Sequence, residues 1–206
     1  QRPGACSHNK DWQQHYWDRV YRMYARDKNH PSITMWSLGN ESHGYLNQDY
    51  CYDELKKLST LPIHYEGVCR TPRFAYDVIS HMYAWPIMCE KIAKGKLPKY
   101  RKKPFFLCEY AHAMGVGAGE LERYVKCFYS SENMLGGCIW EFADHAVYHE
   151  NEKVKYTYGG DHGEEKHDGN FCMDGLVYPD RTPHTGLLEY KNVYRPVRIV
   201  SYDQEN

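Results

Sequence analysis

Two glutamates stand close behind short apolar runs, where they could perform acid–base or nucleophilic chemistry. Glu109 follows the run Pro104 to Leu107, whose length and aromatic content predict a strand buried on both faces. Glu41 follows the run Ile33 to Leu38 in the same way. Burying a charge is costly unless a partner compensates it. Each glutamate is therefore either a hydrogen-bonded structural group or a working group at the end of a strand.

The repetition of this arrangement favours chemistry over structure. In a barrel of parallel strands, the carboxyl ends of all strands open on one face, which is where active sites of that architecture lie. A retaining glycosidase needs two carboxyl groups about 5 Å apart, one protonated to assist the leaving oxygen and one ionised to attack the anomeric carbon. The residues alone do not distinguish which of Glu41 and Glu109 would take each role.

The spacing of apolar residues predicts that strands alternate with helices, which is typical of an α/β fold with a parallel sheet. Asp11 is the expected N-cap of the first helix. The polar, glycine- and histidine-rich segment 141–175 is long enough to predict a functional loop over the site. The predicted strands are 33–38, 63–65, 77–83, 104–107 and 138–140, and the predicted helices are 11–27, 46–58, 87–93, 117–130 and 184–192.

Composition narrows the class of protein. With 26 basic and 27 acidic residues and no basic run, the chain gives no reason to expect nucleic acid as a partner. It has no apolar run of about 18 residues and no signal-peptide core at its first residues, so a soluble cytoplasmic protein without membrane contact is expected. The eight cysteines could form a disulfide scaffold, but their wide spread and the lack of a C-x-x-C pair favour free thiols and argue against zinc.

Six motifs of the chain match a known family. They are Arg26 to Ser32, Trp36 to Ser42, His81 to Ala84, Cys108 to Gly115, Gly136 to Trp140 and Asn170 to Val177. On these motifs, residues 8 to 198 resemble the catalytic domain of the large bacterial β-galactosidases of the second glycoside hydrolase family. The Asn-Glu pair is shared with many sugar hydrolases, whereas the Cys-Glu-Tyr-Ala-His-Ala-Met-Gly motif is far more specific.

The resemblance implies a partial TIM barrel. At 206 residues the chain is shorter than the ~250 typical of a complete (β/α)8 barrel. By the resemblance, its five βα units would be barrel strands four to eight, within a catalytic-domain fragment at 1–198. Residues 199–206 would begin a following domain or tail, with 197–202 as its first strand.

The resemblance also assigns roles to the two glutamates and to a neighbouring amide. It implies that Glu41 is the general acid/base and that Glu109 is the nucleophile. Asn40 resembles the asparagine that hydrogen-bonds the sugar 2-hydroxyl; on the residues alone it could be a loop-turn asparagine. The expected substrate is a β-galactoside.

Three further side chains are expected at the sugar. Tyr83 resembles a tyrosine that hydrogen-bonds the nucleophile. His112 resembles a histidine that contacts galactose, although it could equally cap the next helix. Trp140 matches a tryptophan at the floor of the sugar site, a role that is compatible with packing in the core.

Two metal sites are implied by the resemblance, and both are incomplete in this chain. Mg²⁺ would be held by Glu41 and by a Glu-Thr-His-Gly segment, in whose place the chain has Gln1 to Gly4 with only the glycine retained. Na⁺ would be held by the backbone carbonyl of Phe171 and by a side-chain oxygen at Asp174, where the family has asparagine. The remaining ligand would come from a domain outside the chain.

Two functions of different class remain open at this point. One is a retaining β-galactosidase fragment, and the other is a truncated, inactive carbohydrate-binding or assembly fragment of such an enzyme. A partial barrel leaves two unpaired strand edges, which predicts a homo-oligomer or association with missing domains.

Overall fold

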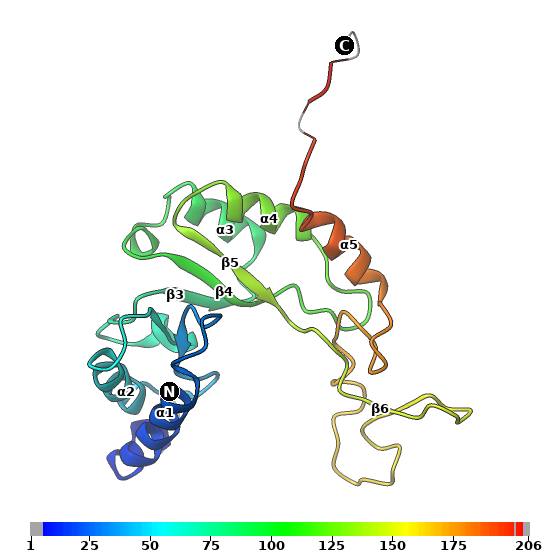
Figure 1. The fold of residues 1–206 in the computed structure, drawn as a ribbon, viewed down its shortest axis with the longest axis horizontal. Helices are drawn as coiled ribbons and strands as arrows, with labels where there is room; N and C mark the ends of the chain where they lie inside the picture. Colours follow the sequence, from blue (N-terminus) through cyan, green and yellow to red (C-terminus); the bar gives the residue numbers. More distant parts are fainter. Residues whose placement is uncertain (1–5, 200, 204–206) are drawn as a thin grey trace. The chain divides into compact units, whose positions relative to one another are not determined.

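The computed structural model describes residues 6–199 and 201–203 (Figure 1). The chain divides into two compact units. The first contains the residues up to 108 together with 130–137, and the second contains 109–129 and the residues from 138 onward. Strands β4 and β5 begin in the first unit and end in the second.

The first unit carries most of the predicted elements. Its helices are α1 (Gln13–Asp27), α2 (Leu46–Lys56) and α3 (Pro86–Ala93). Three strands lie wholly in this unit: β1 (Trp36–Ser37), β2 (Ile63–His64) and β3 (Ile79–Met82). The strands divided between the two units are β4 (Phe105–Tyr110) and β5 (Met134–Ile139). Short 3-10 helices join them: η1 (Cys6–His8), η2 (Lys10–Trp12), η3 (Glu66–Arg70) and η4 (Pro98–Arg101).

Strands β1 to β5 belong to two sheets. β1 and β2 are parallel, with Trp36 opposite Ile63 and Ser37 opposite His64. The second sheet has the order β3-β4-β5, and the N–H of Phe105 donates to the carbonyl of Asn133 at 2.6 Å where two of its strands begin. The α/β class is confirmed.

The start of α1 differs from the prediction. Asp11 is not its N-cap, because Lys10–Trp12 forms a 3-10 helix and α1 begins at Gln13. The N-cap of α1 is Trp12, which makes no side-chain capping bond, whereas the Asn9 side chain caps the 3-10 helix by accepting the N–H of Asp11 at 2.9 Å. An asparagine at this position satisfies a backbone donor that the short helix leaves open.

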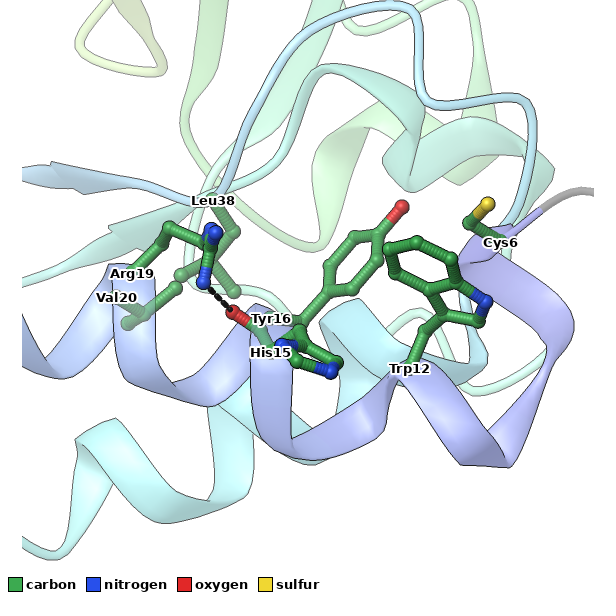
Figure 2. A pocket seen from close by; sticks show the side chains of 7 residues that line it. All are labelled: Cys6, Trp12, His15, Tyr16, Arg19, Val20 and Leu38. Carbon is green, nitrogen blue, oxygen red and sulfur yellow. Dashed lines mark hydrogen bonds between the residues drawn. The ribbon is translucent and has the colours of Figure 1, made fainter.

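One face of α1 borders a cavity of about 380 Å³ within the first unit (Figure 2). Tyr16 points toward it from α1, Trp12 from η2, and Leu38 lies just after β1. Arg19 Nη1 donates to the carbonyl of His15 at 3.2 Å. None of the described lining residues carries a carboxylate, so this cavity does not match the predicted chemistry.

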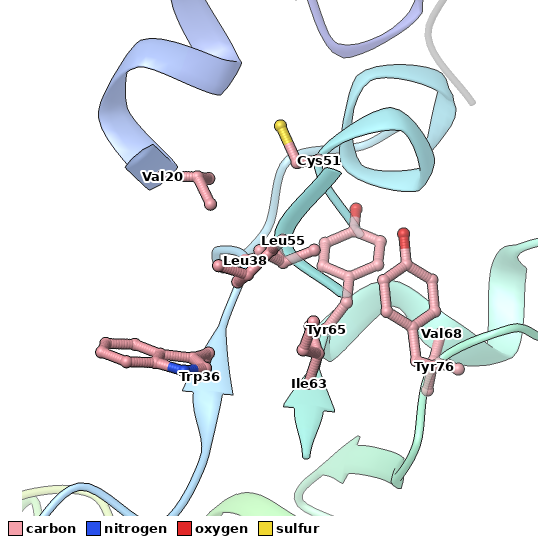
Figure 3. Close-up of a cluster of buried hydrophobic side chains, with 9 residues drawn as sticks. All are labelled: Val20, Trp36, Leu38, Cys51, Leu55, Ile63, Tyr65, Val68 and Tyr76. Carbon is pink, nitrogen blue, oxygen red and sulfur yellow. The ribbon is translucent and has the colours of Figure 1, made fainter. Parts of the chain in front are cut away.

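The core of the first unit lies between α1, α2 and the first sheet (Figure 3). Its largest side chains come from the strands and the loops that follow them, and Leu55 enters from α2. Buried apolar groups of this kind supply most of the stabilisation of a small unit. The members are Val20, Trp36, Leu38, Cys51, Leu55, Ile63, Tyr65, Val68 and Tyr76.

The second unit contains α4 (Leu121–Tyr129), α5 (Thr185–Val193) and a hairpin of β6 (Val147–Tyr148) with β7 (Tyr156–Thr157). Tyr110, at the end of β4, is fully buried, and its hydroxyl hydrogen-bonds that of Tyr194 after α5. Its ring centroid lies 5.0 Å from that of Tyr124 and 5.6 Å from that of Phe128, both on α4.

Two segments depart from expectation. The segment 141–175, for which no secondary structure was predicted, contains the antiparallel β6–β7 hairpin. Conversely, no strand occurs in the described part of 197–202, which is 197–199 and 201–202. A strand needs a partner for its backbone groups, and no pairing with this segment is found among the described residues.

The eight cysteines are all free thiols, as the sequence predicts. In the part of the chain that the structure describes, no helix has the length and apolar character needed to cross a membrane.

The buried histidine of β2 makes the stability of the first unit depend on pH. Burial lowers the pKa of His64 to about 4 from 6.5. On acidification the unfolded chain binds a proton before the folded chain does, so stability present above pH 6.5 is lost as the pH falls toward 4. We expect the free energy of unfolding, measured with urea, to fall by about 2 kcal/mol between pH 7 and 5 from this group.

His64→Asn is the matched variant for this prediction. Its side chain can still pair with Ser37, whose hydroxyl lies 2.8 Å from Nδ1 of His64, but it does not titrate. The difference in pH dependence between the two proteins isolates the histidine. An equal fall in the free energy of unfolding in the wild type and the variant would show that His64 is not the source of the pH dependence.

Candidate active site

The predicted site residues fall in both units. Asn40, Glu41 and Tyr83 belong to the first unit, and the remaining five belong to the second: Glu109, His112, Trp140, Phe171 and Asp174. The distance of about 5 Å between the Glu41 and Glu109 carboxyl groups stays a prediction.

The Glu41 loop is a tightly held turn after β1. Glu41 has φ +45°, a left-handed conformation that is uncommon for a residue with a side chain. The hydroxyl of Ser7 donates to the carbonyl of Ser42 at 2.7 Å, and that of Tyr65 donates to the carbonyl of Gly44. Gly44 has to be glycine because a Cβ would lie 2.1 Å from Ser7 Oγ. The exposed side chain of Glu41 thus projects from a fixed backbone.

Left-handed residues recur in the other predicted site loops. Tyr83, directly after β3, has φ +52°. Ala111, between Glu109 and His112, has φ +50°. Such conformations persist only where the surroundings hold them, and they cluster at binding and catalytic sites.

Glu109 lies inside a strand and not after it. β4 runs through Tyr110, and Glu109 is half-buried within it. A strand position holds a side chain more rigidly than a loop does, which suits a group that must attack at a defined angle.

One buried carboxylate joins several predicted residues of the second unit. Asp174 is 3% exposed, and its Oδ2 accepts the indole N–H of Trp140 at 2.9 Å. Nε2 of His112 lies 3.6 Å from the same oxygen. The ring centroids of His112 and Phe171 are 6.1 Å apart. These four residues, which are distant in the sequence, therefore form one cluster.

The backbone ends of β4 and β5 support this cluster. The N–H of Trp140 donates to the carbonyl of Tyr110 at 3.1 Å, and the N–H of Ala113 donates to the carbonyl of Trp140 at 2.8 Å. The loop bearing His112 is thereby tied to the strand end that carries Trp140.

A third carboxylate, Glu141, borders Asp174. Its N–H donates to the carbonyl of Asp174 at 2.9 Å. Burial raises the pKa of Glu141, the adjacent Asp174 carboxylate raises it further, and His145, whose Nε2 lies 3.0 Å from Glu141 Oε2, opposes the rise. The sequence reasoning missed Glu141, although it follows a predicted strand just as Glu41 and Glu109 do.

Comparison with known proteins shows the family of the chain. A family model described as "Glycosyl hydrolases family 2, TIM barrel domain" matches residues 4–199. The chain belongs to glycosyl hydrolase family 2. A β-galactosidase from Priestia megaterium is 41% identical over 94% of the chain, and one from Kluyveromyces lactis is also 41% identical over 94%. The family 2 chain spans about a fifth of the length of these relatives, 19% and 20% respectively.

Solved structures support the fold of this family 2 domain. The apo β-glucuronidase of Ruminococcus gnavus matches 90% of the chain with a TM-score of 0.60 and 21% identity, and the chain covers 37% of that protein. Its complex with D-glucuronic acid matches 89% with a TM-score of 0.58. At this identity the likeness concerns the fold alone.

The sequence reasoning also missed a buried carboxylate–histidine pair, Asp144 and His184. Asp144 is buried; one of its oxygens accepts the N–H of Gly175 at 2.8 Å, and the other lies 2.7 Å from Nε2 of His184. This pair fixes the backbone beside Asp174. No spacing signal in the sequence links these residues, because they are 31 and 40 positions apart.

A cavity of about 590 Å³ lies in the second unit of the family 2 domain, and its described lining includes none of the predicted sugar-binding residues themselves. His184 and the glycine-rich segment 115–118 line it, together with Ala113 and Gly175, which directly follow His112 and Asp174. The volume is within the range of small-molecule sites.

Of the two implied ions, Na⁺ has a candidate side-chain ligand among the described residues. Oδ1 of Asp174 is buried and has no hydrogen-bond partner among the described residues, which suits an oxygen ligand for a cation. For Mg²⁺, the segment Gln1 to Gly4 lies outside the described residues, and Glu41 is the one described residue of that set. No cluster of three or more metal-binding side chains is found in the ranges described.

Proposed function

We propose that this chain is the catalytic part of a retaining β-galactosidase that hydrolyses terminal, non-reducing β-galactose. The observation that carries the proposal is the presence of Glu41 and Glu109 in β-galactosidase motifs. The Asp174 cluster supports it, since one carboxylate orients His112 and Trp140. The five strands β1 to β5 would be barrel strands four to eight, in a domain that ends near residue 198.

The two glutamates would act in two displacements. In the first, the Glu109 carboxylate attacks the anomeric carbon while the glycosidic bond breaks and Glu41 gives its proton to the leaving oxygen. In the second, the Glu41 carboxylate removes a proton from water, whose oxygen attacks the anomeric carbon and releases Glu109. The net reaction adds one water across the glycosidic bond.

Neighbouring residues would bind and orient the sugar. Asn40 would hydrogen-bond the 2-hydroxyl, an interaction that strengthens at the transition state. Tyr83 would donate a hydrogen bond to the Glu109 carboxylate. His112 and Trp140 would contact galactose from orientations set by Asp174.

The metal roles are part of the proposal. Asp174 and the carbonyl of Phe171 would hold Na⁺, which when bound supplies positive charge beside the sugar site. Glu41 would be one ligand of Mg²⁺.

Turnover of nitrophenyl β-galactoside tests the function. We expect hydrolysis by the natural polypeptide that contains this segment, and slower or no hydrolysis of the matched β-glucuronide. The same assay on the 206-residue chain separates a catalytic fragment from an inactive carbohydrate-binding or assembly fragment. Light scattering tests the expected association with another copy; a compact monomer would contradict it.

Loss of the Asp174 carboxylate should raise KM more than it lowers kcat. Asp174→Ala removes the acceptor of the Trp140 indole N–H and the charge beside His112. We expect KM for nitrophenyl galactoside to rise about tenfold with kcat within about threefold of the wild type. Asp168→Ala is the control, because Asp168 is exposed in the same loop. An unchanged KM would argue against the cluster as a sugar-binding element.

A further inference from the structure

The turn that presents Glu41 is held by a residue with no assigned role. Glu66, the first residue of η3, is 7% exposed, and its Oε2 accepts the N–H of Glu41 at 3.3 Å. Its other oxygen, Oε1, receives the guanidinium of Arg70. The two carboxylate oxygens therefore serve different donors.

Burial makes this arrangement demanding. A buried carboxylate is unfavourable unless hydrogen-bond donors or a cation compensate its charge. For Glu66, the backbone N–H of Glu41 is the donor and the guanidinium of Arg70 is the cation. The backbone that it contacts is itself unfavourable, since Glu41 has φ +45°. A left-handed residue persists only when neighbouring contacts define it. The hydrogen bond from the Glu41 N–H joins these two features.

Arg70 is the group that compensates the charge of Glu66, because the neighbouring thiol and imidazole are neutral. A cavity of about 260 Å³ beside the pair is also lined by Cys69 and His81. Burial raises the pKa of the Cys69 thiol and lowers the pKa of His81, so both groups are neutral near pH 7. Cys69 Sγ and His81 Nε2 lie 3.4 Å apart and partner each other.

We propose that Glu66, compensated by Arg70, is the positioning residue for Glu41. It fixes the left-handed turn from which the Glu41 side chain delivers its proton to the leaving oxygen. The catalytic consequence rests on the proposed function, whereas the contact with the Glu41 backbone does not.

Glu66→Gln tests the proposal with an isosteric side chain. The two donors bind different oxygens of Glu66, and glutamine replaces one of these oxygens with an NH₂ donor, so it cannot accept from Arg70 and from the Glu41 N–H at both places. Measured in the natural polypeptide, kcat/KM for an alkyl β-galactoside should fall about 100-fold, because an alkoxide leaves only with a proton. For 2,4-dinitrophenyl β-galactoside, whose leaving group needs no proton, the fall should be less than about threefold.

Two further variants sharpen the test. Adding Arg70→Met to Glu66→Gln frees the amide oxygen for the Glu41 N–H, and should restore kcat/KM for the alkyl galactoside to within about tenfold of the wild type. Glu54→Gln is the control: it removes a carboxylate paired with Lys57 on α2, and both substrates should be unaffected. Equal losses on both substrates, no loss, or a double variant worse than the single one would overturn the proposal.

Hydrogen exchange of the Glu41 amide gives a readout that is independent of activity. In Glu66→Gln this exchange should speed up about tenfold, because the acceptor is lost. An unchanged rate would overturn the contact. Faster exchange in a protein that hydrolyses no galactoside would support the positioning contact and reject the proposed function, so the two failures are distinguishable.

Discussion

Glu109→Gln is expected to abolish turnover of nitrophenyl β-galactoside, with a fall in kcat of about 10⁴-fold or more. Glutamine has nearly the same shape as glutamate but no negative charge, so it cannot form the covalent bond to the anomeric carbon. Because a strand fixes where its side chains point, no neighbouring residue of β4 is expected to replace Glu109 as the nucleophile.

Mass spectrometry after incubation with a 2-fluoro-galactoside checks the same residue directly. The wild type should gain one sugar on Glu109, and the variant should gain none. Glu165→Gln, at an exposed position of the second unit, should be labelled like the wild type. Labelling that persisted in Glu109→Gln would show that another residue is the nucleophile.

Glu41→Gln is expected to separate substrates by their leaving groups. For an alkyl galactoside, kcat/KM should fall about 10²- to 10⁴-fold, because the variant cannot protonate the departing oxygen. For 2,4-dinitrophenyl galactoside, kcat/KM should be nearly unchanged, whereas kcat should fall because water lacks a general base in the second step.

Azide checks the second half of this prediction. As an anion it attacks without a base, so it should restore kcat of Glu41→Gln on the dinitrophenyl substrate and form galactosyl azide. Equal losses in kcat/KM on both substrates, with no response to azide, would contradict the acid/base role. For Glu66→Gln we expect the same difference between the two substrates but a smaller fall in kcat/KM. This result would indicate that Glu66 acts through Glu41.

Helices were more predictable from the sequence than strands. The bounds of α1, α2 and α5 follow the apolar spacing closely, because a helix satisfies its own backbone hydrogen bonds. The predicted strand 33–38 is reduced to Trp36–Ser37, because its length depends on a partner, and β2 pairs with only those two residues. The β6–β7 hairpin lacked an apolar alternation that could reveal it.

The candidate site was predictable as motifs but not as contacts. Glu41, Glu109 and their neighbours stand out because each motif is contiguous in the sequence. The bond from Trp140 to Asp174 joins residues 34 apart, and only the folded chain brings them together. Glu66 follows the strand Ile63–His64 much as Glu41 follows β1, yet an acidic residue in the first turn of a helix is so common that it attracts no attention.

The buried Tyr110 has a consequence for the register of β4. It is the residue next to Glu109, and its hydroxyl meets that of Tyr194, 84 positions further along the chain. Slippage of β4 by one residue would place this ring on the opposite side of the sheet and withdraw it from α4 and α5. Substitution of Tyr194 or Tyr124 should therefore disturb the alignment of the neighbouring glutamate, even though neither residue needs to meet the sugar.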